Sequence, residues 1–214
     1  MDIISQLADS VQNGKIKLVK EQVEQALAQA ISPAVILNDG MIAAMTVVGT
    51  KFKNNEIYVP EMLIAARAMG EGLKVLEPVL IASGVKPVGK AVIGTVKGDL
   101  HDIGKNLVRM MMQGAGIEMH DIGIDTPAAD FLAKAQEVQA DFVCLSALLT
   151  TTMAEMEAVI KEFQQAGVRK DFVFMIGGAP VTEDFAQKIG ADFYAPDAVH
   201  AADVARDVLH KKYA

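Results

Sequence analysis

The sequence predicts an α-helical bundle followed by a doubly wound, parallel α/β domain. Apolar residues recur three or four positions apart from Ile3 to Ser83, a spacing typical of helices. From residue 90 onward, apolar runs typical of buried strands alternate with helical segments. The segment GVKPVGK, residues 84–90, separates the two patterns and is expected to be an interdomain linker. With 214 residues, 51% of them hydrophobic, the chain can bury a substantial core.

Four helices are expected in the N-terminal part, over residues 3–14, 16–31, 32–52 and 59–83. Pro33, directly after Ser32, is expected in the first turn of the third helix, and Pro60 near the start of the fourth. Pro78 lies late in the fourth helix, which it should bend or end. These four segments together suggest a small bundle.

The C-terminal part is expected to contain strands near 91–96, 117–122, 141–147, 172–177 and 191–195. Helices are expected near 103–114, 127–139, 152–166, 183–189 and 198–212, with Thr126, Thr182 and Asp197 as N-caps. Five successive βα units predict a flavodoxin-like (Rossmann-type) five-stranded parallel sheet with strand order 2-1-3-4-5. That order places strands 1, 3 and 4 side by side.

Three unusual loops follow these neighbouring strands: GDLHDIGKN (98–106), SALLTTT (146–152) and GGAP (177–180). In an open parallel sheet, ligands bind at the carboxyl ends of the strands. We therefore expect the three loops to form one site.

Composition excludes several classes of function. A net charge of −7, a pI near 5.1 and the lack of Lys or Arg runs argue against nucleic-acid binding. No run of eighteen uncharged apolar residues and no basic-then-apolar leader occurs, so we expect a cytoplasmic protein with no membrane partner. The single Cys144, inside DFVCLSAL, excludes a disulfide framework or a multi-cysteine metal cluster and is expected to be a buried, inert thiol.

The motifs, in this order, resemble a known family. DLHDIG at 99–104, SAL at 146–148 and GGA at 177–179 resemble the cobalamin-binding domain shared by methionine synthase, cobalamin-dependent mutases and the corrinoid proteins of methylotrophic methyltransferase systems. VPEMLIAARAMGEGLKVLEP, residues 59–78, resembles the fourth helix of the bundle that caps the methyl-bearing face of the cofactor. The resemblance covers nearly the whole chain. It implies a helical cap domain over residues 1–84 and a cobalamin-binding domain over residues 90–214.

The resemblance also implies roles for individual residues. His101 would be the lower axial ligand of cobalt, in a relay with Asp99 and the hydroxyl of Thr152. The lower-face loop would be Gly98, Asp99, Leu100, His101, Asp102, Ile103 and Gly104. The slot for the nucleotide tail of the cofactor would be lined by Ser146, Leu148, Thr150, Gly177, Gly178, Ala179 and Tyr194. The capping helix would contact the upper face through Tyr58, Met62 and Ala65.

The residue chemistry agrees with this assignment. A neutral imidazole is a good ligand for cobalt, and Asp99, two residues before His101, can accept from the other ring nitrogen. One His and one Asp make a poor zinc site, because catalytic zinc needs about three protein ligands. A metal that brings four equatorial nitrogens of its own needs only one.

The function implied is that of a corrinoid methyl carrier. It would shuttle a methyl group on cobalt between a substrate-specific corrinoid methyltransferase and an acceptor methyltransferase whose acceptor is a thiol or a tetrahydrofolate-type compound. The cofactor would be cobalamin or a related corrinoid, as methylcobalamin or cob(I)alamin, and a reductive activator is a further candidate partner. The chain is expected to be a non-catalytic subunit. Methanol, methylamines, betaines and aryl methyl ethers all remain open as the methyl donor.

Three alternative functions would share part of this pattern. A cobalamin-sensing regulator would carry a DNA-binding module and a Trp-x-x-x-Glu-His motif, whereas this chain has no tryptophan. The small subunit of a cobalamin-dependent isomerase would share the lower-face loop but has no need of a capping bundle. A receiver-type signalling domain requires an aspartate at the end of strand 3, where Ser146 stands.

Overall fold

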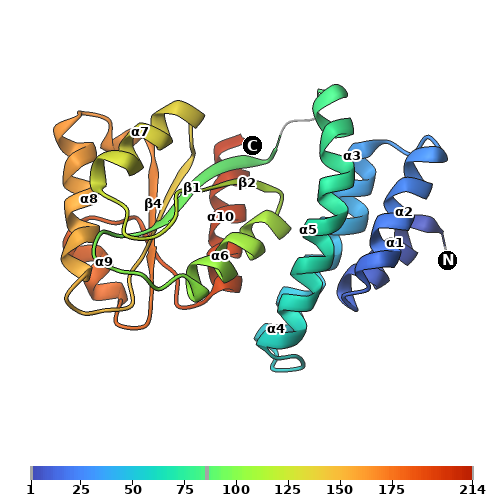
Figure 1. Cartoon of the computed structure of the whole chain (residues 1–214), viewed down its shortest axis with the longest axis horizontal. Coiled ribbons are helices and arrows are strands. Elements are labelled where there is room, and N and C mark those ends of the chain that lie inside the picture. Colours follow the sequence, from blue (N-terminus) through green and yellow to red (C-terminus); the bar gives the residue numbers. More distant parts are fainter. Residues whose placement is uncertain (1, 85–86, 214) are drawn as a thin grey trace. The chain divides into compact units, whose positions relative to one another are not determined.

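The computed structural model describes residues 2–84 and 87–213 (Figure 1). It divides into two compact units, one of the residues up to Pro87 together with Gln113–Gly116, the other of Val88–Met112 and the residues from Ile117 onward. Residues 85 and 86, in the middle of the expected linker, lie outside the described residues. Gly89 and Lys90, also expected in the linker, already belong to the first strand.

The first unit is helical, as the apolar spacing predicts. It contains α1 (Ile3–Gln12), α2 (Ile16–Ala28), a helix from Pro33 to Lys53, and α5 (Val59–Ala82). The third helix is made of α3 (Pro33–Val35), a π-helical segment (Ile36–Ile42) and α4 (Ala43–Lys53), and the π-helical segment was not predicted. Buried apolar residues of the expected faces form the core, among them Leu7, Val19, Val23, Ile36, Met41 and Leu76.

Two features of these helices differ from simple expectation. Pro78 does not end α5, which runs on to Ala82. Pro78 and Lys74, whose carbonyl loses its usual donor, are both exposed, so water can satisfy that carbonyl.

The helix Pro33–Lys53 is long and apolar enough to cross a membrane by length and composition. Buried helices of water-soluble domains pass the same test, and 44% of its most apolar window is buried.

The second unit is built on a five-stranded parallel sheet. Its strands are β1 (Gly89–Thr95), β2 (Ile117–Asp121), β3 (Phe142–Ser146), β4 (Val173–Gly177) and β5 (Phe193–Tyr194), and their order is β2-β1-β3-β4-β5, as predicted. The register pairs Thr95 with Ser146 and Ser146 with Gly177. The loops after β1, β3 and β4 therefore begin at the same level of the sheet.

Helices cover both faces of this sheet (Figure 1). One face carries α7 (Ala128–Val138), α8 (Met153–Gln165) and α9 (Glu183–Ile189), and the other carries α6 (Ile103–Gly114) and α10 (Ala198–Tyr213). A short 3-10 helix, Arg169–Asp171, precedes β4. Buried side chains of α7, α8 and α9 form a core with the sheet that includes Phe131, Phe163, Phe174, Met156 and Ile160.

Two of the three predicted N-cap residues cap their helices. Thr182 caps α9 by accepting from the N–H of Phe185, and Asp197 accepts from the N–H of His200 in the first turn of α10. The prediction for Thr126 was wrong, because Pro127 is the N-cap residue of α7. The Thr126 hydroxyl instead donates to the carbonyl of Ile122, 3.2 Å away, within the preceding loop.

Candidate functional site

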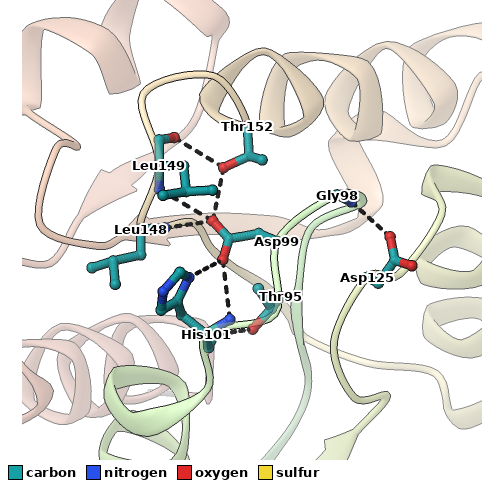
Figure 2. A network of polar contacts seen from close by, with 8 residues as sticks. All are labelled: Thr95, Gly98, Asp99, His101, Asp125, Leu148, Leu149 and Thr152. Atoms are coloured by element: carbon teal, nitrogen blue, oxygen red, sulfur yellow. Dashed lines mark hydrogen bonds and ion pairs between the residues drawn. The ribbon is translucent and has the colours of Figure 1, made fainter.

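The carboxylate of Asp99 joins the loops that follow β1 and β3 (Figure 2). Its Oδ2 accepts from the backbone N–H groups of Leu148 at 2.7 Å and Leu149 at 3.2 Å. Asp99 is fully buried, with 0% of its surface exposed. Two loops that are about fifty residues apart in sequence are thus held together by one side chain.

The other oxygen of Asp99 holds His101. Oδ1 lies 2.7 Å from Nδ1 of the imidazole and accepts from the N–H of His101 at 3.1 Å (Figure 2). The imidazole is half exposed, at 50%, and its Nε2 has no hydrogen-bond partner among the described residues. Because a carboxylate only accepts, the proton of a neutral imidazole lies on Nδ1 and leaves the Nε2 lone pair free to bind a metal.

Thr152 completes this network. Its hydroxyl lies 2.7 Å from Oδ2 of Asp99 and 2.9 Å from the carbonyl of Leu149. Burial alone would favour the neutral acid, but hydrogen bonds from Leu148, Thr152 and His101 outweigh burial and hold the pKa of Asp99 well below its ordinary value. The carboxylate is therefore ionised, and the Thr152 hydroxyl can donate to it.

Two further side chains hold the same loop and were not singled out for this from the sequence. The hydroxyl of Thr95, at the end of β1, donates to the carbonyl of His101 at 2.8 Å. The carboxylate of Asp125 accepts from the N–H of Gly98 at 2.6 Å, and the N–H of Asp125 donates to the carbonyl of Asp99 at 2.9 Å. A threonine in an apolar strand gives no signal of such a role in the sequence.

The surface around the imidazole is apolar. Ile103 is 81% exposed, and Leu100 and Leu148 are also exposed. A Cβ placed on Gly104 would meet no atom within 4 Å, so the first turn of α6 faces open space here. Among residues 2–84 and 87–213 there is no group of three or more His, Cys, Asp and Glu side chains that could hold a metal ion. The site suits a metal that arrives with most of its ligands on a flat apolar ring, for which His101 supplies one axial ligand.

The predicted tail-binding residues lie at the carboxyl ends of β3, β4 and β5. Thr150 and Ala179 are exposed, while Ser146 and Tyr194 are half-buried. Gly178 has φ +135°, and a Cβ there would lie 1.8 Å from the carbonyl oxygen of Ala147. This glycine is therefore required by the approach of two protein loops, and its role toward a ligand stays a prediction.

The remaining predicted residues are on other elements. Asp102 lies just before α6 and accepts from the side chain of Asn106 at 3.0 Å. On the capping helix, Tyr58 is 67% exposed, whereas Met62 and Ala65 are buried. Burial thus leaves Tyr58 as the most accessible of the three, and the assignment of all three to a cofactor face stays a prediction.

Comparisons with known proteins identify the family. Two family models, both described as a B12 binding domain, match residues 3–77 and 89–203. Dimethylamine corrinoid protein 3 of Methanosarcina acetivorans is 43% identical over 207 residues, covering 97% of each chain. Trimethylamine corrinoid protein 1 of the same organism is 39% identical over 210 residues, again covering 97% of each.

A solved structure has the same fold over almost the whole chain. A chain of the methanol:cobalamin methyltransferase complex MtaBC from Methanosarcina barkeri superposes with a TM-score of 0.87 and 28% identity, over 97% of this chain and 80% of that one. The free Nε2 of His101, the apolar surface around it and these matches agree. This protein belongs to the B12-binding corrinoid proteins.

Proposed function

We propose that this protein is a corrinoid methyl carrier, which shuttles a methyl group between a substrate methyltransferase and an acceptor methyltransferase that uses a thiol or a tetrahydrofolate-type acceptor. The observation that carries the proposal is the half-exposed imidazole of His101, fixed through Nδ1 by a buried carboxylate and open at Nε2. When bound, the corrinoid supplies a cobalt ion that accepts and releases the methyl group.

The residues of the chain bind and orient. His101 would ligate cobalt through Nε2, and Asp99 would keep the proton on Nδ1. The amides of Leu148 and Leu149 and the hydroxyl of Thr152 hold Asp99 in place and ionised. Leu100, Ile103 and Leu148 are exposed apolar side chains that would lie under the ring of the corrinoid.

The two parts of the chain would have separate tasks. Residues 90–214 would hold the corrinoid from its lower side, with the predicted tail slot at the ends of β3 to β5. Residues 1–84 would be the cap for the upper, methyl-bearing side. The separate family matches to residues 3–77 and 89–203 support this division.

We further propose a methylated amine as the methyl donor. The supporting observation is that relatives at 43% and 39% identity, matched over 97% of the chain, are named dimethylamine and trimethylamine corrinoid proteins. The similarity to a chain of a methanol:cobalamin methyltransferase complex supports a substrate methyltransferase as partner. The acceptor methyltransferase, a reductive activator and a cytoplasmic location are further parts of the proposal.

The experiment is a reconstituted methyl transfer. Reduced holo-protein is mixed with a methyltransferase that co-purifies with it, and each of monomethylamine, dimethylamine, trimethylamine and methanol is added separately. Methylation of the cofactor, followed by its visible spectrum, is expected with one of the amines and not with methanol. Methylation by methanol alone would contradict the donor class, and no methylation by any donor with any co-purifying methyltransferase would contradict the carrier role.

A further inference from the structure

The loop that carries His101 is held by side chains that do not touch the imidazole. Thr95 donates to the carbonyl of His101 at 2.8 Å, and its side chain is fully buried. Asp125 accepts from the N–H of Gly98 at 2.6 Å (Figure 2). These two hydrogen bonds fix the backbone at both ends of the segment 98–101, whereas Asp99 orients the imidazole ring of His101.

Asp125 is itself in an unfavourable backbone conformation. Its φ is +51°, in the left-handed region that costs a non-glycine residue energy, although Asp and Asn tolerate it better than most. Two bonds compensate: the carboxylate accepts from Gly98, and the N–H of Asp125 donates to the carbonyl of Asp99 at 2.9 Å. The loop after β2 is thereby hydrogen-bonded to one side of the loop after β1. The loop after β3 is bonded to its other side.

We propose that Thr95 and Asp125 are positioning residues, which fix the backbone of residues 98–101 so that the imidazole of His101 is preorganised to bind cobalt. The inference rests on the proposed function, because it assumes that His101 is the axial ligand. A loop that is free to move would spend ordering entropy when the ligand bond forms, and the two side chains have already restricted it. Their loss should therefore weaken axial ligation without removing the ligand.

The change is expected in the Co(II)/Co(I) potential. Co(I) takes no axial base, so axial ligation stabilises Co(II) and lowers the potential. Loss of one hydrogen bond should weaken ligation of Co(II) about two- to tenfold. Because tenfold corresponds to 59 mV for a one-electron couple, the potential should rise by about 20 to 60 mV.

Matched variants separate the hydrogen bond from the fold. Thr95→Val removes the hydroxyl and keeps the shape, while Thr95→Ser keeps the hydroxyl. Asp125→Gly removes the acceptor and accepts the left-handed backbone freely, while Asp125→Asn keeps both an acceptor oxygen and tolerance of that backbone. Each holo-variant is prepared with ¹⁵N-labelled histidine and is measured by potentiometric titration and by electron paramagnetic resonance of its Co(II) state. An axial ¹⁵N nucleus of histidine splits each cobalt line into two, whereas the unlabelled base of the cofactor would split it into three.

Thr95→Val and Asp125→Gly should raise the potential, whereas Thr95→Ser and Asp125→Asn should match the wild type. If neither Thr95→Val nor Asp125→Gly differs from wild type while His101→Ala loses the two-line splitting, the positioning role is wrong and the proposed function stands. If only one of Thr95→Val and Asp125→Gly raises the potential, the residue changed in the other variant is not a positioning residue. If the wild type lacks the two-line splitting, or His101→Ala keeps it, both the axial ligand and this inference are wrong. Should Thr95→Val fail to fold, the exposed Asp125 pair decides the matter alone.

Discussion

At the scale of single residues, the carboxylate of Asp99 serves both the stability of the protein and the function we propose for it. Both of its oxygens are occupied: one by the imidazole and N–H of His101, the other by two backbone amides and the Thr152 hydroxyl. A buried carboxylate is costly unless it is fully hydrogen-bonded, and this one is. The side chain that fixes the tautomer of His101 therefore also joins the loops of β1 and β3.

This predicts that Asp99→Asn destabilises the protein even without its cofactor. The neutral amide removes the charge that all five donors face, and its NH₂ group cannot accept from the donors on whichever side it takes. We expect the free energy of unfolding of the apo-protein to fall by about 2 kcal/mol, measured by urea denaturation at neutral pH. His101→Ala is the matched control and should cost less than half as much, since its ring is half exposed. Equal losses would mean that the carboxylate is not the centre of the network.

Whether a contact of this site can be predicted from the sequence depends on how far apart its two partners lie in the chain. The Asp99–His101 pair could be predicted because two residues separated by one position in a loop can interact locally, and Thr152 followed from the family resemblance. The donors Leu148 and Leu149 are backbone groups, which no residue pattern marks. Thr95 and Asp125 act on carbonyl and N–H groups of another segment, so only the folded arrangement of three loops reveals them.

At the scale of elements, two glycines at the site have different reasons to be glycine. A Cβ on Gly178 would collide with the carbonyl of Ala147, whereas a Cβ on Gly104, in the first turn of α6, would meet nothing within 4 Å. The first glycine is needed by the fold. The second is not, and close approach of the corrinoid is the role we propose for it.

We therefore expect opposite effects of the same substitution. Gly178→Ala should lower the free energy of unfolding of the apo-protein by about 3 kcal/mol or more. Gly104→Ala should leave it unchanged or raise it by up to about 1 kcal/mol, yet weaken corrinoid binding about tenfold through overpacking. Urea denaturation measures the free energy of unfolding, and a corrinoid titration measures the affinity for the cofactor. Unchanged corrinoid affinity in Gly104→Ala would remove Gly104 from the site.

Within the helical unit, an ion pair links α2 and α5. Glu71 lies 2.6 Å from the ammonium groups of both Lys20 and Lys74, and these contacts, Lys20 first, lower its pKa to about 2. The pKa is lower when folded than the ordinary 4.5, so the stabilisation is complete above that value and is lost as the pH falls toward 2. The contribution should be small because the pair is near the surface.

The test compares Glu71→Gln with Glu77→Gln, a change on the same helix at an exposed glutamate for which the structure gives no ion pair. Thermal unfolding is followed between about pH 2 and pH 7. The melting temperature of Glu71→Gln should be below that of the wild type at neutral pH, and the difference should shrink to nothing near the acid end. Glu77→Gln should show no such trend. A difference that persists at the lowest pH would mean that lost packing is responsible.

At the scale of the whole molecule, the strand order could be predicted because short βα units have one favoured handedness and leave few arrangements. That order, with Thr95, Ser146 and Gly177 in register, is what brings the three loops together. The π-helical segment Ile36–Ile42 and the passage of α5 through Pro78 could not be predicted, because tertiary packing and solvent exposure decide them. Local patterns thus predicted the architecture, while its irregular details depend on contacts across the fold.

The whole chain is expected to carry a methyl group without activating a methyl donor. Amines and alcohols hold their methyl groups strongly, and attack on them needs a positioned acid or electrophile that lowers the barrier by several kcal/mol. The carboxylates close to His101 are already used to hold the protein: Asp99 binds five donors, Asp102 accepts from Asn106, and Asp125 accepts from Gly98. We therefore expect a separate methyltransferase to supply the acid.

In the test, each methylated amine and an acceptor are added to reduced holo-protein without any methyltransferase. The visible spectrum of the cofactor is followed over many equivalents of donor. At most slow, unsaturable methylation is expected, and addition of the substrate methyltransferase should accelerate it by orders of magnitude. Asp102→Asn and Asp125→Asn should leave the slow background rate unchanged, because neither carboxylate acts as the proton donor. Sustained turnover by the chain alone, lost in one of these variants, would identify that residue as the acid and make this protein an enzyme in its own right.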